Sequence, residues 1–409
     1  QDTTWNEHEP HGTLSRIDFI MGSTLQGEVM NIMEQAELIQ PEKSAPSLID
    51  ELEFRLSNDE LDARDQRYDF RLRPNNPTLR NRTKELYDLR KKQLQADAEL
   101  ALSDEILIRY ELILDWLELH KKSQLLDEKI NINNQRLDWL KQYPGADFFD
   151  ADTYTESVME KLELWSQRAE LDLKLAALNR VVQQKVQSNK TPILLWDKNF
   201  DLSAEYIQHF MASLPSTFDE HRKLYLAELA IKEIELENKV DKASVDLGFI
   251  QAEYFPNRVN KSLIGLSAGI TLPLFQTDRA DLMDNRLESK EREFELFETR
   301  QQISYDVQRW KEHLHATLNY YLELRANYES INLSELTKTL QSLDEFEPLK
   351  GLELKELELK WQEIEQEWYL EIVRSYIGLL SQLDWLSTYK DIDWLSTESV
   401  SSFRSFPAN

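Results

Sequence analysis

The side chains that most often perform catalysis are scattered along this sequence and form no known motif. Its 409 residues include seven histidines and no cysteine. No HExxH, no GxSxG and no glycine-rich phosphate loop occurs. His313 and His315 stand two positions apart in a predicted helix, so their rings point in different directions. His8 and His11 lie in a polar leader, where only a weak surface metal site could form. Carboxylate pairs are too frequent to be diagnostic, so we expect neither an enzyme nor a bound cofactor or metal.

Acidic residues dominate the charge of the chain. It has 48 lysines and arginines against 75 aspartates and glutamates, for a formal net charge of −27. Such a chain repels phosphates, so nucleic acid is not an expected partner. No apolar run approaches the roughly 18 residues that a membrane-spanning helix needs. Gln1 opens a polar segment without a start methionine, which suggests a mature form whose export signal has been removed.

Long helices are the predicted framework. Glycine (9) and proline (12) are scarce. Neither occurs from Thr78 to Tyr143, a stretch of about 66 residues or roughly 100 Å of helix. Leucine and isoleucine follow heptad spacing there in two adjacent rows: Leu100, Leu107 and Leu114, and Ile106, Ile113 and Leu117. Two rows indicate helical neighbours on both sides, as in a closed wall of helices, although a two-stranded coiled coil is the alternative.

Two regions with period-two patterns predict pairs of strands between the helices. In the first, apolar residues alternate with charged ones; in the second, they alternate with small or polar ones. The outward-facing candidates are Leu52, Phe54, Tyr68, Phe70 and Leu72 in the first pair, and Ile264, Leu266, Ile270 and Leu272 in the second. The strands of the second pair have about 10–11 residues, enough to cross a bilayer when tilted.

The order of strand pair, long helix, turn and returning helix occurs twice, which indicates an internal repeat. The predicted divisions are a leader with a short helix (1–50), a first β-hairpin (51–74), a first helical hairpin (75–190), a linker region (191–217), a lead-in helix (218–243), a second β-hairpin (244–275), a second helical hairpin (276–390) and a flexible tail (391–409).

Residues 243–287 resemble the second strand pair of the TolC-type outer-membrane efflux protein family. The shared features are a Leu-Pro-Leu-Phe at the strand-to-helix junction, a following basic residue (Arg279) and a helix. The segment LAELAIKEIELENKVDKA resembles the family's lead-in helix, and SYIGLLSQLDWL resembles its closing helix. The resemblance is specific over about 218–390; in the first half it rests mainly on element order.

The resemblance implies a mainly α fold with a small β part, in which long antiparallel helical hairpins and two β-hairpins form a trimeric α-barrel and β-barrel channel. It implies a passive exit duct for an efflux or type I secretion system. The expected partners are two sister copies, a periplasmic adaptor, an inner-membrane transporter and outer-membrane lipid. The expected location is the outer membrane and periplasm of a Gram-negative bacterium.

The first strand pair departs from the family pattern because its connection, SNDELDARDQ, is very polar. The connection in the second pair, PNRVNKS, is also short. A non-conducting periplasmic subunit of a larger envelope assembly, with a reduced or absent membrane barrel, is therefore the alternative. An acidic tunnel would concentrate cations, although surplus carboxylates could equally well solvate exposed helix faces.

The tip of the first helical hairpin holds the remaining candidates. Pore or adaptor roles are assigned to Asp147, Phe148, Phe149, Asp150 and Asp152. The aspartates could form acidic rings on threefold repetition, but Asp150 and Asp152 also stand where N-cap residues belong, and the cap is favoured for Asp152. The two phenylalanines could enter an adaptor groove or fold back as a staple. A second tip lies somewhere in 327–350.

Overall fold

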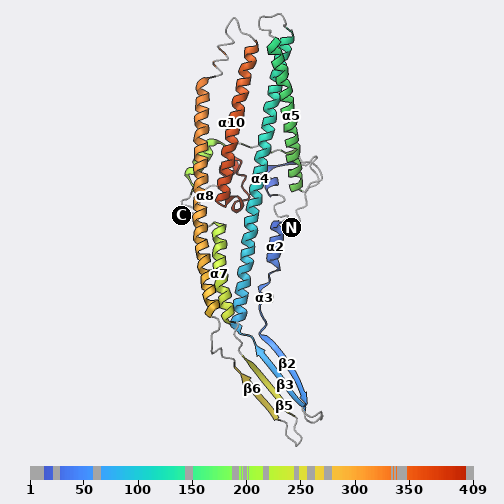
Figure 1. Cartoon of the computed structure of the whole chain (residues 1–409), viewed down its shortest axis with the longest axis vertical. Helices are drawn as coiled ribbons and strands as arrows, with labels where there is room; N and C mark the ends of the chain where they lie inside the picture. Colours follow the sequence, from blue (N-terminus) through green and yellow to red (C-terminus); the bar gives the residue numbers. More distant parts are fainter. Residues whose placement is uncertain are drawn as a thin grey trace. The chain divides into compact units, whose positions relative to one another are not determined.

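The computed structural model describes residues 13–21, 28–58, 66–142, 151–186, 193–194, 196, 200, 202–214, 221–243, 248–255, 263–270, 279–332, 335, 338 and 348–401. Its elements in chain order are β1 (Thr13–Leu14), α1 (Arg16–Met21), α2 (Glu28–Leu38), α3 (Pro41–Ser44), β2 (Ile49–Asn58), β3 (Gln66–Pro74), α4 (Pro77–Gln142), α5 (Ala151–Val186), β4 (Ile193–Leu194), α6 (Ala204–Ala212), α7 (Arg222–Ala243), β5 (Phe249–Phe255), β6 (Leu263–Gly269), α8 (Arg279–Ile331), α10 (Pro348–Gln382), α11 (Trp385–Thr388) and α12 (Thr397–Ser401) (Figure 1). The predicted fold class, mainly helical with a small antiparallel sheet, is confirmed.

The chain folds into two compact units, and each takes several stretches of sequence. Unit 1 comprises Gln1–Leu25, Leu102–Phe218 and Ile303–Asn409, and unit 2 comprises Gln26–Ala101 and Asp219–Gln302. Unit 2 contains the four-stranded sheet, and unit 1 contains α5 and α10. The long helices α4 and α8 each belong to both units.

Helix α4 starts where its sequence predicts. The Asn76 side chain accepts a hydrogen bond from the Thr78 backbone N–H at 3.0 Å, and Pro77 occupies the first helical position, where its missing N–H costs nothing. The helix then continues for 66 residues to Gln142. The predicted rows supply part of its buried face, since Ile106, Ile113, Leu114 and Leu117 are all buried.

Gly248 fixes the start of strand β5. Its φ of +92° lies in the region that favours glycine, and a Cβ built there would come within 1.9 Å of the Gly269 carbonyl oxygen. Because that neighbour is backbone, it has no side-chain rotamer to change. We therefore expect Gly248→Ala to destabilise the protein by at least about 1–3 kcal/mol. Denaturant unfolding should show the loss, whereas Gly265→Ala, whose added Cβ would meet only ordinary contacts near 3.6 Å, should be far milder.

Segments from both ends of the chain pack into the core of unit 1. Arg16 and Asp393 are buried, and the Arg16 guanidinium donates hydrogen bonds at 3.0 and 2.9 Å to the Asp393 carboxylate and at 2.8 Å to the Trp196 carbonyl. Trp394 is also buried. The predicted flexible tail is therefore wrong for residues 391–401. Within the predicted leader, helix α1 also packs into this core, since Phe19 and Ile20 are buried. Residues 402–409 lie outside the described part.

The Arg16–Asp393 pair yields a second prediction. Removing one partner leaves the other as an uncompensated buried charge, which typically costs about 3–5 kcal/mol. We expect Arg16→Met to lower the free energy of unfolding by that amount and to expose the C-terminal segment to proteases. Arg55→Met removes an exposed salt bridge to Glu53 and serves as the control, with an expected cost under about 1 kcal/mol. Equal stability losses in the two variants would contradict this role.

The end of the second helical hairpin differs from its prediction. The sequence predicts that this hairpin continues to residue 390, but α10 ends at Gln382 and Asp384 has a φ of +60° before the short helix α11. The predicted linker, 191–217, contains the amphipathic helix α6. The Ser203 side chain caps α6 by accepting a hydrogen bond from the Tyr206 backbone N–H at 3.0 Å.

Candidate functional site

The sheet of unit 2 has one continuous apolar face. Its strands pair antiparallel in the order β2-β3-β5-β6 (Figure 1). The register sets four side chains in a row across the strands, for example Phe54, Phe70, Ala252 and Leu266. The twelve residues of this apolar face are Leu52, Phe54, Leu56, Tyr68, Phe70, Leu72, Ile250, Ala252, Tyr254, Ile264, Leu266 and Ala268. Two strand pairs far apart in the sequence thus contribute to one surface.

In the single chain, most large side chains of the apolar face are uncovered. Phe54 is 65 % exposed, Ile264 73 % and Leu266 79 %. Ile270, just after β6, is 78 % exposed, and the predicted candidate Leu272 lies outside the described residues. A contiguous apolar surface of this kind marks an interaction with protein or membrane. Sequence reasoning missed the contribution of Leu56, Ile250 and Tyr254, although period-two alternation in each strand could have found them.

The opposite face of the same sheet is polar and carries paired charges. Arg67 bonds to Asp69 at 3.0 Å and to Glu253 at 2.9 Å. Arg73 bonds to Glu51 at 2.8 Å on the neighbouring strand. The sheet therefore presents its apolar face to one side, and the other side carries the ion pairs of β2, β3 and β5 together with Phe249. This is the alternation of a barrel wall between lipid and an aqueous interior.

The sheet is open along the described residues, because β2 and β6 each have a single neighbour. An open edge presents unpaired N–H and C=O groups. In lipid each unsatisfied group costs several kcal/mol, so only a closed barrel is viable there. The two edge strands of the described sheet, β2 and β6, are therefore available for further pairing.

The helices of unit 1 form an open row in the order α8–α10–α4–α5. Tyr328 of α8 stacks on Trp361 of α10 with ring centroids 3.8 Å apart. Lys129 of α4 bonds to Glu363 of α10 at 2.7 Å. Arg136 links α4 to α5 through Glu160 at 3.0 Å. Each inner helix thus has neighbours on both sides, as the two heptad rows of α4 predict, while α5 and α8 stand at the ends.

Charge pairs hold α4 to α10 beside these contacts. Arg374 of α10 donates to Asp115 at 2.7 Å and to Glu118 at 2.8 Å. Partial burial alone would raise the pKa of Glu118, but the hydrogen bonds from Lys122 and Arg374 outweigh it, so the pKa lies below its ordinary value. Because the pKa of Glu118 is lower in the folded protein than in the unfolded chain, its ionised carboxylate stabilises the fold at pH values above the unfolded pKa of about 4.5. This contribution is lost as the pH falls through the folded pKa.

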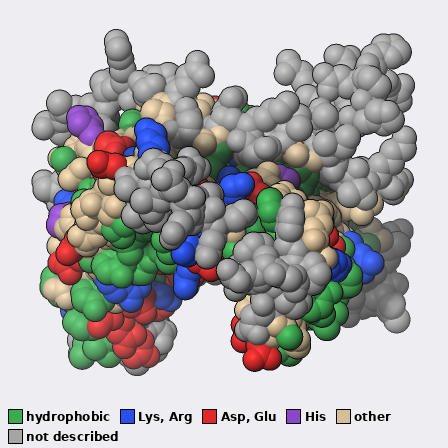
Figure 2. All heavy atoms as spheres, turned by 90° about the horizontal axis from the view of Figure 1, so that it is seen from above, with side chains coloured by type: hydrophobic (Ala, Val, Ile, Leu, Met, Phe, Trp, Pro, Cys, Tyr) green, Lys and Arg blue, Asp and Glu red, His purple; other side chains and the backbone are tan. Residues whose placement is uncertain are grey.

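The two end helices of unit 1 carry uncovered apolar side chains. On α5 Leu162 is 59 % exposed and Trp165 is 53 % exposed. These residues belong to the predicted row Val158, Leu162, Trp165, Ala169 and Ala176, which is exposed in the single chain although the Lys161 ammonium of the same helix lies 5.1 Å from the centroid of the Trp165 ring. On α8, Tyr305, Tyr320 and Ile331 are exposed. Figure 2 shows hydrophobic side chains uncovered beside acidic and basic ones on the surface that it presents.

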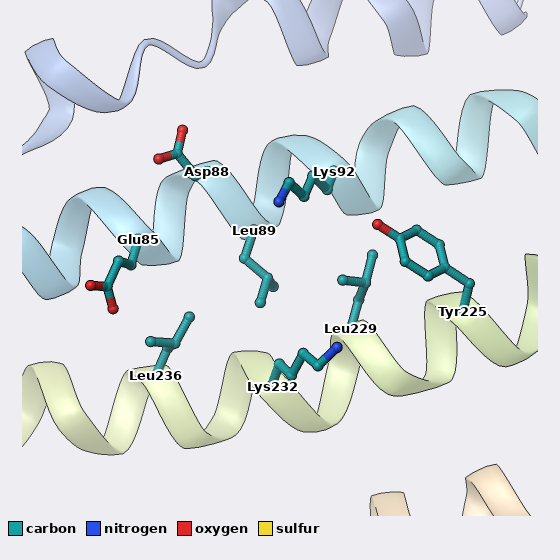
Figure 3. A pocket seen from close by; sticks show the side chains of 8 residues that line it. All are labelled: Glu85, Asp88, Leu89, Lys92, Tyr225, Leu229, Lys232 and Leu236. Carbon is teal, nitrogen blue, oxygen red and sulfur yellow. The ribbon is translucent and has the colours of Figure 1, made fainter.

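The helices of unit 2 are also joined by side-chain contacts. Arg90 of α4 bonds to Glu233 of α7 at 2.8 Å, and this hydrogen bond raises the pKa of the arginine. Between α4 and α7 lies a groove of about 410 Å³. In Figure 3, Leu89 and Leu229 point into this space and Tyr225 lies toward Lys92. Asn285 of α8 bonds to Asn238 of α7, so α4, α7 and α8 are consecutive neighbours.

The tip candidates Asp147, Phe148, Phe149 and Asp150 lie outside the described residues, and their pore or adaptor roles stay predictions. Asp152 lies in the first turn of α5, which starts at Ala151. The prediction that Asp152 is the N-cap is therefore wrong by position, because the cap precedes Ala151. Its charge still lies near the positive end of the helix dipole.

Among the described residues, no histidines, aspartates or glutamates are grouped so that they could hold a metal ion. No helix in the described ranges is long and apolar enough to cross a membrane.

Comparison with known proteins identifies the fold. No protein-family profile matches the chain, and no curated relative is similar in sequence. Solved structures do match over nearly the whole chain. The open-state outer-membrane channel MtrE of Neisseria gonorrhoeae gives a TM-score of 0.64 at 10 % identity, covering 94 % of each chain. The outer-membrane protein VceC of Vibrio cholerae gives 0.63 at 11 % identity, covering 90 % of this chain and 96 % of its own.

The outer-membrane channel CmeC of Campylobacter jejuni gives a TM-score of 0.62 at 11 % identity, covering 98 % of this chain and 96 % of its own. The resemblance to TolC-type proteins is thus confirmed at the level of the fold: this chain has the fold of these outer-membrane channels.

Proposed function

We propose that this protein is the outer-membrane exit duct of an efflux or type I secretion system. Three copies each contribute four strands to a twelve-stranded barrel, and their helices ring a periplasmic tunnel. The duct is passive: an inner-membrane transporter supplies the energy, and a periplasmic adaptor connects the two. The chain performs no catalysis and resides in the outer membrane and periplasm of a Gram-negative bacterium.

The observation that carries this proposal is the two-faced sheet. Its twelve-residue apolar face and its paired charges occupy opposite sides of the same four strands. In water, uncovered side chains such as Leu266 and Ile264 gain nothing from exposure. Against lipid they are matched to their surroundings, and closure by sister copies pairs both free edges.

The helices support closure of the same ring. In unit 1 the row α8–α10–α4–α5 leaves apolar side chains uncovered at each end. A sister copy that sets its α5 against this α8 would cover Trp165 and Leu162 with Tyr320 and Ile331. Such an interface is head-to-tail, and head-to-tail interfaces close into rings when the rotation allows.

A non-conducting periplasmic subunit remains the second candidate because the first strand pair is rich in charge. The duct and the scaffold differ in what covers the apolar face of the sheet. In a periplasmic scaffold, that face packs on another protein, and the assembly extracts without detergent.

Fractionation of cells that produce the protein tests the proposal. We expect the protein in the outer-membrane fraction, released only by detergent, with a native mass near three times 48.4 kDa. Release by salt or buffer alone, in a form that stays in solution without detergent, would favour the scaffold and contradict the duct.

A further inference from the structure

The polar face of the sheet is balanced in charge, unlike the whole chain. Its described ionisable residues are Arg55, Arg67, Arg71, Arg73, Glu51, Glu53, Asp69 and Glu253. Three of the four arginines form ion pairs: Arg55 with Glu53, Arg67 with Asp69 and Glu253, and Arg73 with Glu51. Arg71 alone forms none with the described residues, so it is the one arginine on this face without a carboxylate partner.

The surroundings of Arg71 hold it in place without neutralising it. Its guanidinium carbon lies 3.8 Å from the centroid of the Phe249 ring. That ring lies over Gly269, where a Cβ would come within 2.5 Å of it. The Arg71 Nε is buried and has no hydrogen-bond partner. Stacking on an aromatic face fixes the guanidinium plane and leaves its charge intact.

The carboxylates nearest in register are committed elsewhere. Glu53 stands directly opposite Arg71 on β2, but it bonds to Arg55 at 2.6 Å. On β5, Gln251 stands opposite and donates to Glu253 at 2.9 Å. The carboxylates that could pair with Arg71 are thus bonded to other side chains.

We propose that Arg71 is a contact point for anionic oxygen groups, carboxylate or phosphate, of material that passes through the duct. The planar fork of a guanidinium matches the geometry of both groups. The inference rests on the proposed function, under which the polar face lines the interior and three copies place three such arginines at one level. The duct then interacts with anions at this level despite the acidity of the chain.

Reversal potentials across a planar bilayer test the proposal, with purified protein in a gradient of potassium phosphate. We expect Arg71→Gln to lower phosphate permeability relative to potassium by about fivefold, as loss of one charge-assisted contact implies. Arg71→Lys should retain an intermediate value, since it keeps the charge and loses the fork. Arg73→Gln, which removes the same charge from a paired position on the same face and leaves Glu53 bonded to Arg55, should change the ratio by less than twofold.

Equal shifts for Arg71→Gln and Arg73→Gln, or no shift for Arg71→Gln, would overturn the inference while leaving the duct intact. Absence of conductance in the unaltered protein would contradict the duct, and the inference with it. If Arg71→Gln fails to assemble, chemical modification of the unaltered protein tests the inference instead. Phosphate should slow phenylglyoxal modification of Arg71 several-fold and leave that of Arg55 unchanged; equal protection or none contradicts the proposal.

Discussion

Leu266→Arg is expected to block insertion of the protein into the outer membrane. Leu266 is the central residue of the described strand β6 and is 79 % exposed in the single chain. If it contacts lipid, an arginine near the midplane costs about 2–4 kcal/mol, and each trimer carries the change three times. The measurement is the fraction of protein recovered in the outer membrane and the yield of detergent-stable trimer.

Ser267→Arg is the matched control, because the next residue on the same strand faces the polar side. This variant should insert at the level of the unaltered protein. Comparison of the two variants shows whether the Leu266 side of the strand contacts lipid or water. On a solvent-exposed surface, either substitution would stay within about 0.5 kcal/mol. Normal insertion of Leu266→Arg is therefore the result that refutes lipid contact.

Trp165→Glu is expected to convert the proposed trimer to monomers. Trp165 stands on the uncovered apolar row of α5 and is 53 % exposed. Burying a large apolar side chain contributes about 1.5–3 kcal/mol. Each of the three interfaces would lose this contribution, and each would also have to bury a charge. Native mass spectrometry or light scattering in detergent should show a mass near 48.4 kDa.

Gln167→Glu adds the same charge two residues further along α5, on a different face of the helix. It should leave the trimer intact. Circular dichroism of both variants should retain the helical content of the unaltered protein, because α5 needs neither side chain to form. A trimer that survives Trp165→Glu would show that the α5 row faces something other than a sister copy.

Local sequence patterns predict the main helices and strands. Absence of glycine and proline from Thr78 to Tyr143 predicts α4, and the Asn76-Pro77 start predicts where it begins. Period-two alternation predicts the strands. The apolar candidates on β2, β3 and β6 stand on one face of the sheet, and their contact with lipid stays a prediction.

Tertiary contacts account for what the sequence could not predict. Residues 391–401 are polar and rich in serine, which is typical of a loose tail. The burial of Asp393 depends on Arg16, which lies 377 positions away. No local sequence pattern predicts a pair between residues so far apart. The pairing of β3 with β5, which joins the two hairpins into one sheet, is equally non-local. The stacking of Arg71 of β3 on Phe249 of β5 depends on that strand pairing.

Site-directed spin labelling of strand β5 tests the central claim most directly, and the absence of cysteine from the chain makes each introduced label unique. Labels would be placed one at a time at Ile250, Gln251, Ala252, Glu253 and Tyr254 in membranes. The account predicts that accessibility to oxygen alternates with period two and is high at Ile250, Ala252 and Tyr254, while a water-soluble nickel complex reaches the other two. Uniform access of the nickel complex to all five positions would contradict it.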